Sequence, residues 1–137
     1  MSSSNNLIIN KSNPFLGKII IPGDKSISHR SIILGSIAKG KLSITNFLKS
    51  DDCLQTISAM RSLGAIITDS NEQIIIEGIG LGNIKKPDDI IDAGNSGTLI
   101  RLLTGIVSVE NCSSTITGDE ARNSRPMRRI INPLVTH

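Results

Sequence analysis

The segment Ile19–Arg30 reads IIIPGDKSISHR and passes from three isoleucines, through a Pro-Gly turn, into a polar stretch. β-Branched residues in a row favour a strand, which we predict at Lys18–Ile21. Apolar residues at helical spacing then predict a helix over Ser26–Ala38. We expect the inward face of this helix to consist of Ile27, Leu34, Ile37 and Ala38.

The start of this helix is a candidate anion site. A helix N-terminus has unpaired backbone N–H groups and carries about half a positive charge, and here Lys25, Ser26 and Arg30 surround it. The alternative is ordinary: caps, solvated cations, and a lone His29 that serves as a surface or packing residue. A nucleotide-binding P-loop is not favoured, because Asp24 interrupts the contiguous Gly-Lys-Ser that such a loop needs.

Composition favours a single globular domain with small anionic partners. The chain has 137 residues, of which 38% are apolar and 20% charged, and a formal net charge of +3. Its only aromatic residues are Phe15 and Phe47, so the base-stacking platforms of nucleic-acid binders are missing. We therefore expect no nucleic-acid partner.

The cysteines and the apolar runs indicate the compartment. Cys53 and Cys112 lie far apart with no histidine cluster nearby, which predicts neither a metal site nor a disulfide but two reduced, buried thiols. No apolar run approaches the about 18–20 residues of a membrane span, and the N-terminus lacks the pattern of a signal peptide. We expect a cytoplasmic protein without a membrane partner.

Short strands and helices alternate along the rest of the chain, which predicts an α/β fold. Ser50 is placed to cap a helix whose buried stripe is Cys53, Ile57 and Met60. A hairpin is expected next, at Ala65–Thr68 and Gln73–Glu77. The other predicted elements are strands at Lys41–Asn46, Ile90–Asp92 and Ser113–Thr117, a helix at Ser96–Val107 with Leu99, Leu102, Leu103, Ile106 and Val107 on one face, and a last helix with Met127, Ile130, Ile131 and Leu134 on one face.

This order contains an internal repeat. Aligning Gly23 with Gly94 also aligns Arg30 with Arg101, 71 residues further on, and both halves read strand, glycine turn, helix, strand, helix. The βαβ order allows both glycine turns to lie at one edge of the fold. The second turn, Ala93–Thr98 (AGNSGT), is therefore a second candidate anion site, where Gly97 lets a ligand approach the backbone.

Four blocks together resemble the signature of the 5-enolpyruvylshikimate-3-phosphate synthase family. They are PGDKSISHR at 22–30, SDD at 50–52, DAGNSGT at 92–98 with Arg101, and RPMRR at 125–129, in the family's order and spacing, and the resemblance covers about Gly17 to Leu134. It implies an enolpyruvyl-transferase domain, an inside-out α/β barrel of repeated βαβαββ units. The expected divisions are an N-terminal segment at 1–16, a first unit at 17–80 and an incomplete second unit at 81–137, with the rest of the first domain and the second domain absent.

The resemblance also implies residue roles. Lys25 would be catalytic and would contact both substrates, Ser26 and Arg30 would bind shikimate 3-phosphate, and Gly97 and Arg125 would bind phosphoenolpyruvate. The matched supporting positions are Asp52, Asn95, Thr98 and Arg101. Phosphates and carboxylates on both substrates explain the many cations, since each charge-assisted hydrogen bond contributes about 1.5–3 kcal/mol.

The implied reaction moves the enolpyruvyl group of phosphoenolpyruvate to the 5-hydroxyl of shikimate 3-phosphate and releases phosphate, a step of the shikimate pathway toward chorismate and aromatic amino acids. The resemblance implies no cofactor, no metal, inhibition by glyphosate and a monomeric full-length enzyme. It places the family's carboxylate base and further phosphoenolpyruvate-binding cations outside these residues, so we expect the 137-residue chain alone to be inactive.

Two other functions remain open. The first is a UDP-N-acetylglucosamine enolpyruvyl transferase, a kind of enzyme that shares the implied fold. Such an enzyme has Lys-Asn at the positions of Lys25-Ser26 and carries a cysteine in a glycine-rich loop, a place that neither Cys53 nor Cys112 occupies. A small noncatalytic phosphate-binding domain is the second alternative.

Overall fold

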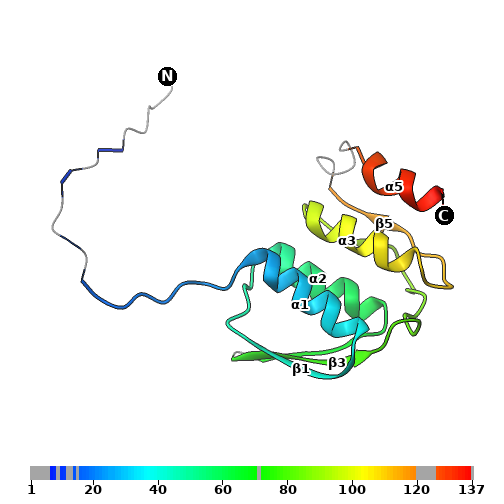
Figure 1. The fold of residues 1–137 in the computed structure, drawn as a ribbon, viewed down its shortest axis with the longest axis horizontal. Coiled ribbons are helices and arrows are strands. Elements are labelled where there is room, and N and C mark those ends of the chain that lie inside the picture. The colour runs from blue at the N-terminus through cyan, green and yellow to red at the C-terminus, as the bar shows by residue number, and fades with distance from the viewer. Residues whose placement is uncertain are drawn as a thin grey trace.

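The computed structural model describes residues 7–8, 10–11, 14, 16–70, 72–119 and 126–136 (Figure 1). Helices and strands alternate over most of this range, as the α/β prediction requires. The elements in chain order are α1 (Lys25–Ile37), β1 (Lys39–Thr45), α2 (Asp51–Ser62), β2 (Ile66–Asp69), β3 (Gln73–Ile79), β4 (Ile91–Asp92), α3 (Gly97–Val107), β5 (Ile116–Thr117) and α5 (Arg128–Val135).

The first half forms a three-stranded sheet with α1 and α2 packed on one of its faces (Figure 1). The strand order is β1-β3-β2, and both outer strands pair antiparallel with β3. The predicted β2–β3 hairpin is confirmed, and Ser70 closes it by donating from its backbone N–H to the Gln73 carbonyl oxygen at 3.0 Å. Since β1 and β2 both oppose β3, they run parallel to each other, and α2 is the connection between them.

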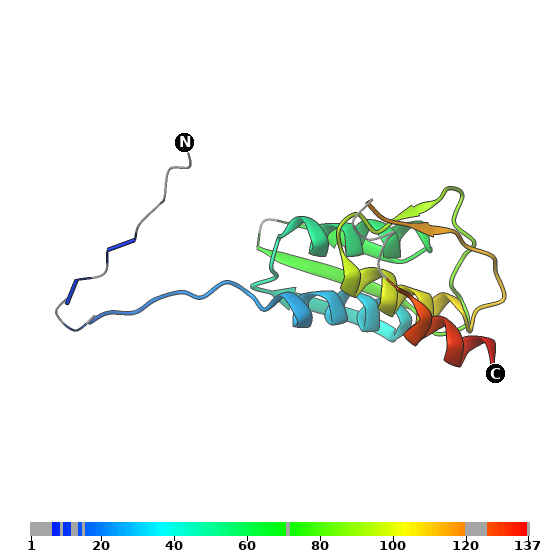
Figure 2. The same cartoon turned by 90° about the horizontal axis from the view of Figure 1, so that it is seen from above.

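The second half begins with a β4–α3–β5 unit. β4 and β5 pair in parallel, with Ile91 opposite Ile116, which confirms the predicted side-by-side strands of a βαβ unit. Helix α3 lies on the side of α1 and α2 away from the sheet, and α5 packs beside α3 (Figures 1 and 2). The fold is therefore layered, with α1 and α2 between the sheet and α3.

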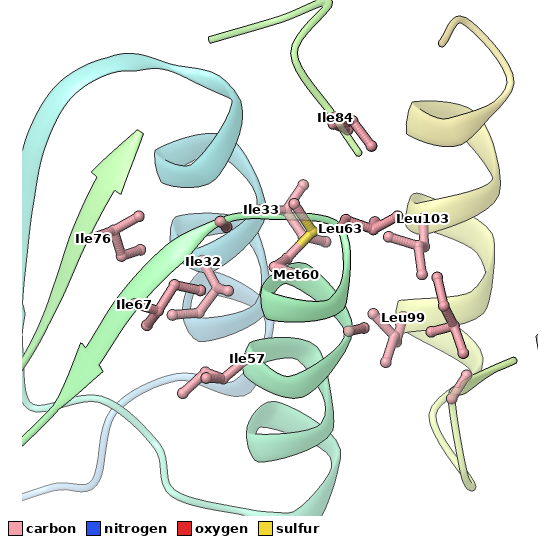
Figure 3. Close-up of a cluster of buried hydrophobic side chains, with 14 of the residues drawn as sticks. Ile32, Ile33, Ile57, Met60, Leu63, Ile67, Ile76, Ile84, Leu99 and Leu103 are labelled. Atoms are coloured by element: carbon pink, nitrogen blue, oxygen red, sulfur yellow. The ribbon is translucent and has the colours of Figure 1, made fainter. Parts of the chain in front are cut away.

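One hydrophobic core runs through these layers (Figure 3). Ile67 and Ile76 enter it from the sheet, Met60 and Leu63 from α2, and Leu99 with its neighbours from α3. The predicted stripe of α2 is confirmed, because Cys53, Ile57 and Met60 are all buried. The predicted face of α3 is confirmed as well: Leu99 and Leu103 are fully buried, and Leu102, Ile106 and Val107 pack against the core.

The predicted inward face of α1 is wrong. Ile27 and Leu34 are 69% and 58% exposed, and Ala38 is exposed, whereas Ile37 is only partly buried. The buried face instead contains Ser28, His29, Ile32, Ile33 and Ser36. Its polar members find partners inside the fold, as when Ser28 Oγ accepts a hydrogen bond from the Leu48 N–H at 3.1 Å. A stripe that is partly polar escapes a search for hydrophobic periodicity.

The predicted strand at Lys18–Ile21 is not a strand. Residues 16–22 extend away from the packed elements (Figures 1 and 2), and Ile19, Ile20 and Ile21 are 80%, 89% and 68% exposed. A strand requires a neighbour for its backbone hydrogen bonds, and the described chain forms no ladder with this segment. The first unit therefore reads αβαββ rather than βαβαββ in this structure.

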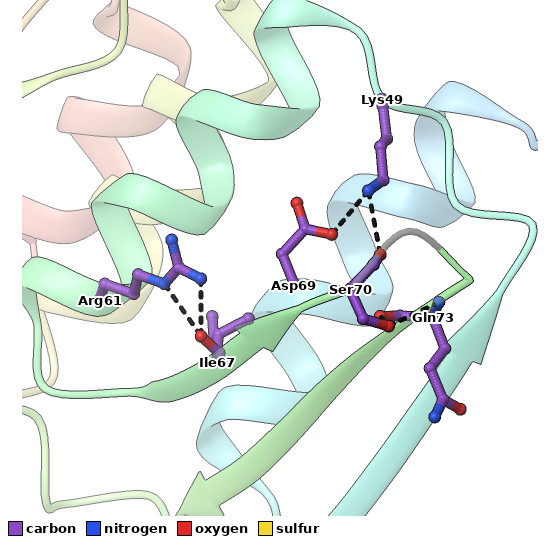
Figure 4. Close-up of polar contacts among 6 residues, drawn as sticks. All are labelled: Lys49, Arg61, Ile67, Asp69, Ser70 and Gln73. Atoms are coloured by element: carbon purple, nitrogen blue, oxygen red, sulfur yellow. Dashed lines mark hydrogen bonds and ion pairs between the residues drawn. The ribbon is translucent and has the colours of Figure 1, made fainter.

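Polar contacts attach the β2–β3 hairpin to the rest of the first half (Figure 4). Arg61 at the end of α2 donates from Nε and Nη2 to the Ile67 carbonyl oxygen, at 3.0 and 2.7 Å. Lys49, just before α2, pairs with Asp69 at 2.7 Å. These contacts hold the hairpin against α2, whose N-terminal turn contributes to the pocket described below.

The prediction of two buried thiols is right for one cysteine. Both cysteines are free, but only Cys53 is buried, and Cys112 is half-buried. Within the described ranges, no helix has the length and apolar character needed to cross a membrane.

Candidate anion-binding pocket

A cavity of about 410 Å³ lies where α1, α2 and α3 begin. Every lining residue belongs to the first six positions of one of these helices, so three positive helix ends are directed toward one space. The lining consists of Lys25, Arg30, Asp52, Gly97, Thr98, Arg101 and Leu102.

Most of the residues singled out in the sequence meet in this pocket. The two glycine turns, far apart in the chain, contribute Lys25 and Arg30 from one side and Gly97, Thr98 and Arg101 from the other. Ser26 and Asn95 are exposed beside the pocket but do not line it. Arg125 lies outside the described residues.

The first turn is shaped by Gly23 and Asp24. A Cβ at Gly23 would collide with the Asn46 carbonyl oxygen, so only glycine fits where the chain passes so close to the end of β1. Asp24 then caps α1 by accepting a hydrogen bond from the Ile27 N–H at 2.7 Å. Helix α1 consequently begins at Lys25 and presents its first turn to the pocket.

The second turn also combines a glycine with a helix-capping side chain, and its cap lies one position later than Asp24 when Gly94 is aligned with Gly23. Ser96 caps α3 by accepting from the Leu99 N–H at 3.2 Å, while Asp92 accepts from the Gly94 N–H at 2.8 Å. Gly94 has a φ of 49°, and a Cβ there would collide with the side chain of Gln55 from α2. The turn is thus held against α2, with Gly97 at the pocket wall.

Arg30 and Arg101 are both anchored by their own helices. Arg30 Nη1 donates to the Ser26 carbonyl oxygen at 3.1 Å, and Arg101 Nη1 donates to the Gly97 carbonyl oxygen at 2.9 Å. A guanidinium group has five N–H donors in a planar fork. Because anchoring uses one of these donors, the remaining N–H groups can still form a bidentate pair of hydrogen bonds with a phosphate or carboxylate.

Lys25 and Asp52 form an ion pair across the α1–α2 contact. Asp52 and its neighbour Asp51 lie in the first turn of α2, where the helix dipole favours negative charge. Ser50 occupies the N-cap position as predicted, yet its hydroxyl makes no capping bond. The pocket therefore combines three cations with one carboxylate and attracts anions.

His29 lies directly behind this ion pair and is fully buried. Its Nδ1 is 2.6 Å from Thr56 Oγ1, and Thr56 Oγ1 is 3.1 Å from the Asp52 carbonyl oxygen. Burial lowers the pKa of His29, and the nearby cations Lys25 and Arg30 lower it further, against the opposing charge of Asp52. The imidazole is therefore neutral near pH 7.

Sequence reasoning missed two residues of this region. Leu102 supplies the apolar part of the lining, and it was assigned only to the core face of its helix. For His29 the sequence predicts only a surface or packing residue; the signal for its place beside the pocket is its position four residues after Lys25 on the same helix. Among the described residues, no group of histidine, cysteine and acidic side chains has an arrangement that could hold a metal ion.

The fold and the pocket together define an α/β protein with a cationic site at converging helix N-termini. Comparisons with known proteins narrow this class. The family model for EPSP synthase (3-phosphoshikimate 1-carboxyvinyltransferase) matches residues 9–137. The chain belongs to the EPSP synthase family.

Individual relatives agree with this assignment. The chain is 48% identical over 118 residues to the 3-phosphoshikimate 1-carboxyvinyltransferase of Citrifermentans bemidjiense, covering 86% of this chain and 28% of the relative. It is 48% identical over 128 residues to the enzyme of that name from Alkaliphilus metalliredigens, covering 93% of this chain and 30% of the relative. A solved EPSP synthase from Acinetobacter baumannii matches with a TM-score of 0.83 and 44% identity, covering 88% of this chain and 28% of that structure. The chain thus spans less than a third of the length of these relatives.

Proposed function

We propose that the protein containing these residues transfers the enolpyruvyl group of phosphoenolpyruvate to the 5-hydroxyl of shikimate 3-phosphate, and that this pocket holds part of both substrates. The observation that carries the proposal is the meeting of Lys25 and Arg30 from α1 with Arg101 from α3 in one pocket, in a member of the EPSP synthase family. A small, cationic, concave site of this kind suits ligands with several anionic groups.

The proposed roles follow the family resemblance. Arg30 and the neighbouring Ser26 bind shikimate 3-phosphate at the first turn, Gly97 at the second turn contacts phosphoenolpyruvate, and Arg125 contacts phosphoenolpyruvate as well. Lys25 belongs to the first turn and contacts both substrates, while the supporting residues keep the pocket in shape. Those supporting residues are Asp52, Asn95, Thr98 and Arg101.

The chemistry requires charge stabilisation and proton transfer. The 5-hydroxyl loses its proton as its oxygen bonds to C2 of phosphoenolpyruvate, and the methylene carbon gains a proton and becomes a methyl group. The tetrahedral adduct then loses a proton from this methyl group and expels phosphate, which restores the double bond. Lys25 is a cation that forms an ion pair with Asp52. It stabilises the negative charge that develops and assists a proton transfer. No cofactor enters this scheme.

The finer features of the proposal follow the family. We propose glyphosate as an inhibitor, a monomeric full-length enzyme and a cytoplasmic location. We also propose the divisions 1–16, 17–80 and 81–137 as an N-terminal segment, a first repeat unit and part of a second. A protein limited to these residues is expected to bind shikimate 3-phosphate without turnover, because completion of the site requires groups from the remaining length.

Calorimetric titration and a transfer assay test the proposal. Shikimate 3-phosphate is titrated into the 137-residue chain and into its Arg30→Ala variant, and phosphate release is measured with a full-length enzyme that carries these residues. We expect binding that weakens in the variant, and turnover of shikimate 3-phosphate but not of UDP-N-acetylglucosamine. Equal affinity for inorganic phosphate and shikimate 3-phosphate, with no turnover at full length, would favour the phosphate-binding domain instead.

A further inference from the structure

We infer that His29 is a positioning residue for the Lys25–Asp52 ion pair, which it supports through the hydroxyl of Thr56. The inference rests on the proposed function, since that function makes Lys25 and Asp52 part of the substrate pocket. It assigns a role to a residue that lies outside the pocket lining.

The four residues form two contacts between α1 and α2, one helical turn apart. Lys25 and His29 are four residues apart on α1, and Asp52 and Thr56 are four residues apart on α2, so each pair occupies one helix face. The first contact is the ion pair at the pocket. The second contact, between His29 and Thr56, lies behind it, and both of its side chains are fully buried.

The inference specifies the tautomer of His29. The Thr56 hydroxyl has one hydrogen, and the Asp52 carbonyl oxygen lies 3.1 Å from the hydroxyl oxygen. We assign the hydrogen to that carbonyl, so that the hydroxyl oxygen accepts a hydrogen bond from His29 Nδ1 at 2.6 Å. The assigned tautomer of the neutral imidazole is therefore the one protonated on Nδ1, and Nε2 is buried with no hydrogen-bond partner among the described residues.

This arrangement explains how a buried histidine influences the pocket. The hydrogen bond between His29 and Thr56 joins α1 to α2, and it orients the Thr56 hydroxyl toward the Asp52 carbonyl oxygen in the first turn of α2. The Asp52 carboxylate is thereby held at Lys25. A residue that only filled space would need the volume of the ring but not its Nδ1–H donor, and this difference is what an experiment can detect.

The tautomer is tested first, on the unmodified chain and without a ligand. Two-bond ¹H–¹⁵N correlation spectra of the ¹⁵N-labelled chain report which ring nitrogen of His29 carries hydrogen. We expect a protonated Nδ1 and an unprotonated Nε2 at pH 7. An Nε2–H tautomer would overturn the inference, and this result does not depend on substrate binding or on the folding of any variant.

Matched variants then test the transmission to Lys25. Thr56→Val keeps the shape of the side chain and removes the hydroxyl, whereas Thr56→Ser keeps the hydroxyl; His29→Leu and His29→Asn form the corresponding pair, because the asparagine amide retains a donor near Nδ1. We expect Thr56→Val and His29→Leu each to shift the Lys25 ¹⁵Nζ resonance and to weaken shikimate 3-phosphate binding about tenfold. The Ser and Asn variants should remain within about twofold of the parent.

The double variant and the readouts separate the possible failures. If His29 acts through Thr56, combining His29→Leu with Thr56→Val should cost little more affinity than either change alone. An unchanged Lys25 resonance in Thr56→Val, or equal losses in the Val and Ser variants, would overturn the inference. Absence of shikimate 3-phosphate binding by the parent chain would instead contradict the proposed function, while the tautomer and the Lys25 resonance would still decide the role of His29.

Discussion

Arg30 and Arg101 make the same hydrogen bond at equivalent points of two helices that line one pocket. Each donates from Nη1 to the carbonyl oxygen four residues earlier, at 3.1 Å for Arg30 and 2.9 Å for Arg101. The accepting residues differ, because Ser26 occupies the position in α1 that Gly97 occupies in α3. The internal repeat thus supplies two anchored guanidinium groups, and the first turn has a serine where the second has a glycine that lines the pocket.

Lys25 and Arg30 are expected to give different kinetic defects in a full-length enzyme that carries these residues. Arg30→Ala should mainly raise the KM for shikimate 3-phosphate, because Arg30 is anchored beside the first turn. Lys25→Met should lower kcat and weaken the binding of both substrates, since Lys25 lines the pocket, pairs with Asp52 and is proposed to contact both substrates. Steady-state kinetics with each substrate varied in turn measure the difference, and equal, purely binding defects would contradict this division of roles.

Gly97→Ala should affect the second turn selectively. Gly97 lines the pocket, so an added methyl group reaches the space proposed for phosphoenolpyruvate and is expected to cost about 1–3 kcal/mol of its binding. Glyphosate, which is longer, should lose more affinity and the variant should be relatively resistant. The KM for each substrate and the glyphosate inhibition constant test this in the full-length enzyme, and a selective rise for shikimate 3-phosphate would show that the two turns are assigned in reverse.

The buried His29 predicts a specific dependence of stability on pH. Burial lowers its pKa in the folded state below the ordinary 6.5, so below that pH the unfolded chain binds the proton more readily. The free energy of unfolding should therefore fall as the pH decreases from about 6.5 through the lowered pKa, with a slope of at most about 1.4 kcal/mol per pH unit for one proton.

Urea unfolding of the chain between pH 7.5 and 5 measures this slope. His29→Asn, which does not titrate, provides the control and should show a smaller loss over the same range. Parallel curves for parent and variant would mean that His29 has the same proton affinity in both states.

Two glycines offer a matched test of packing. A Cβ at Gly78 in β3 would collide with the Ala38 carbonyl oxygen and lie 2.6 Å from that of Gly35, so Gly78→Ala must separate β3 from α1 and should destabilise the fold by about 1–3 kcal/mol. Gly105 is exposed in α3, and a Cβ there meets no atom within 4 Å. Gly105→Ala should stabilise by about 0.5–1 kcal/mol. The denaturant midpoints of both variants measure these changes in stability. A destabilising Gly105→Ala would contradict the packing of α3 described above.

Much of the pocket was predictable because its chemistry is local. Each helix start and each glycine turn is a property of residues close together in the chain, and the repeat places Arg30 and Arg101 at equivalent points after the two turns. These features predicted two anion sites at one edge of the fold, and the structure brings Lys25, Arg30, Gly97, Thr98 and Arg101 to one cavity. The pairing of Lys25 with Asp52 was not predictable in this way, because it depends on how α1 and α2 pack.

The sequence by itself determined the order of the elements from α1 onward, the β2–β3 hairpin and the buried stripes of α2 and α3, because turn residues and hydrophobic spacing act over a few neighbouring positions. Tertiary structure alone decided the buried face of α1 and the extended course of Lys18–Ile21. A polar residue such as His29 can be buried only where a distant partner satisfies it, here Thr56 from another helix, and a strand forms only where another strand accepts its hydrogen bonds. Both conditions depend on residues far away in the chain, which local patterns do not report.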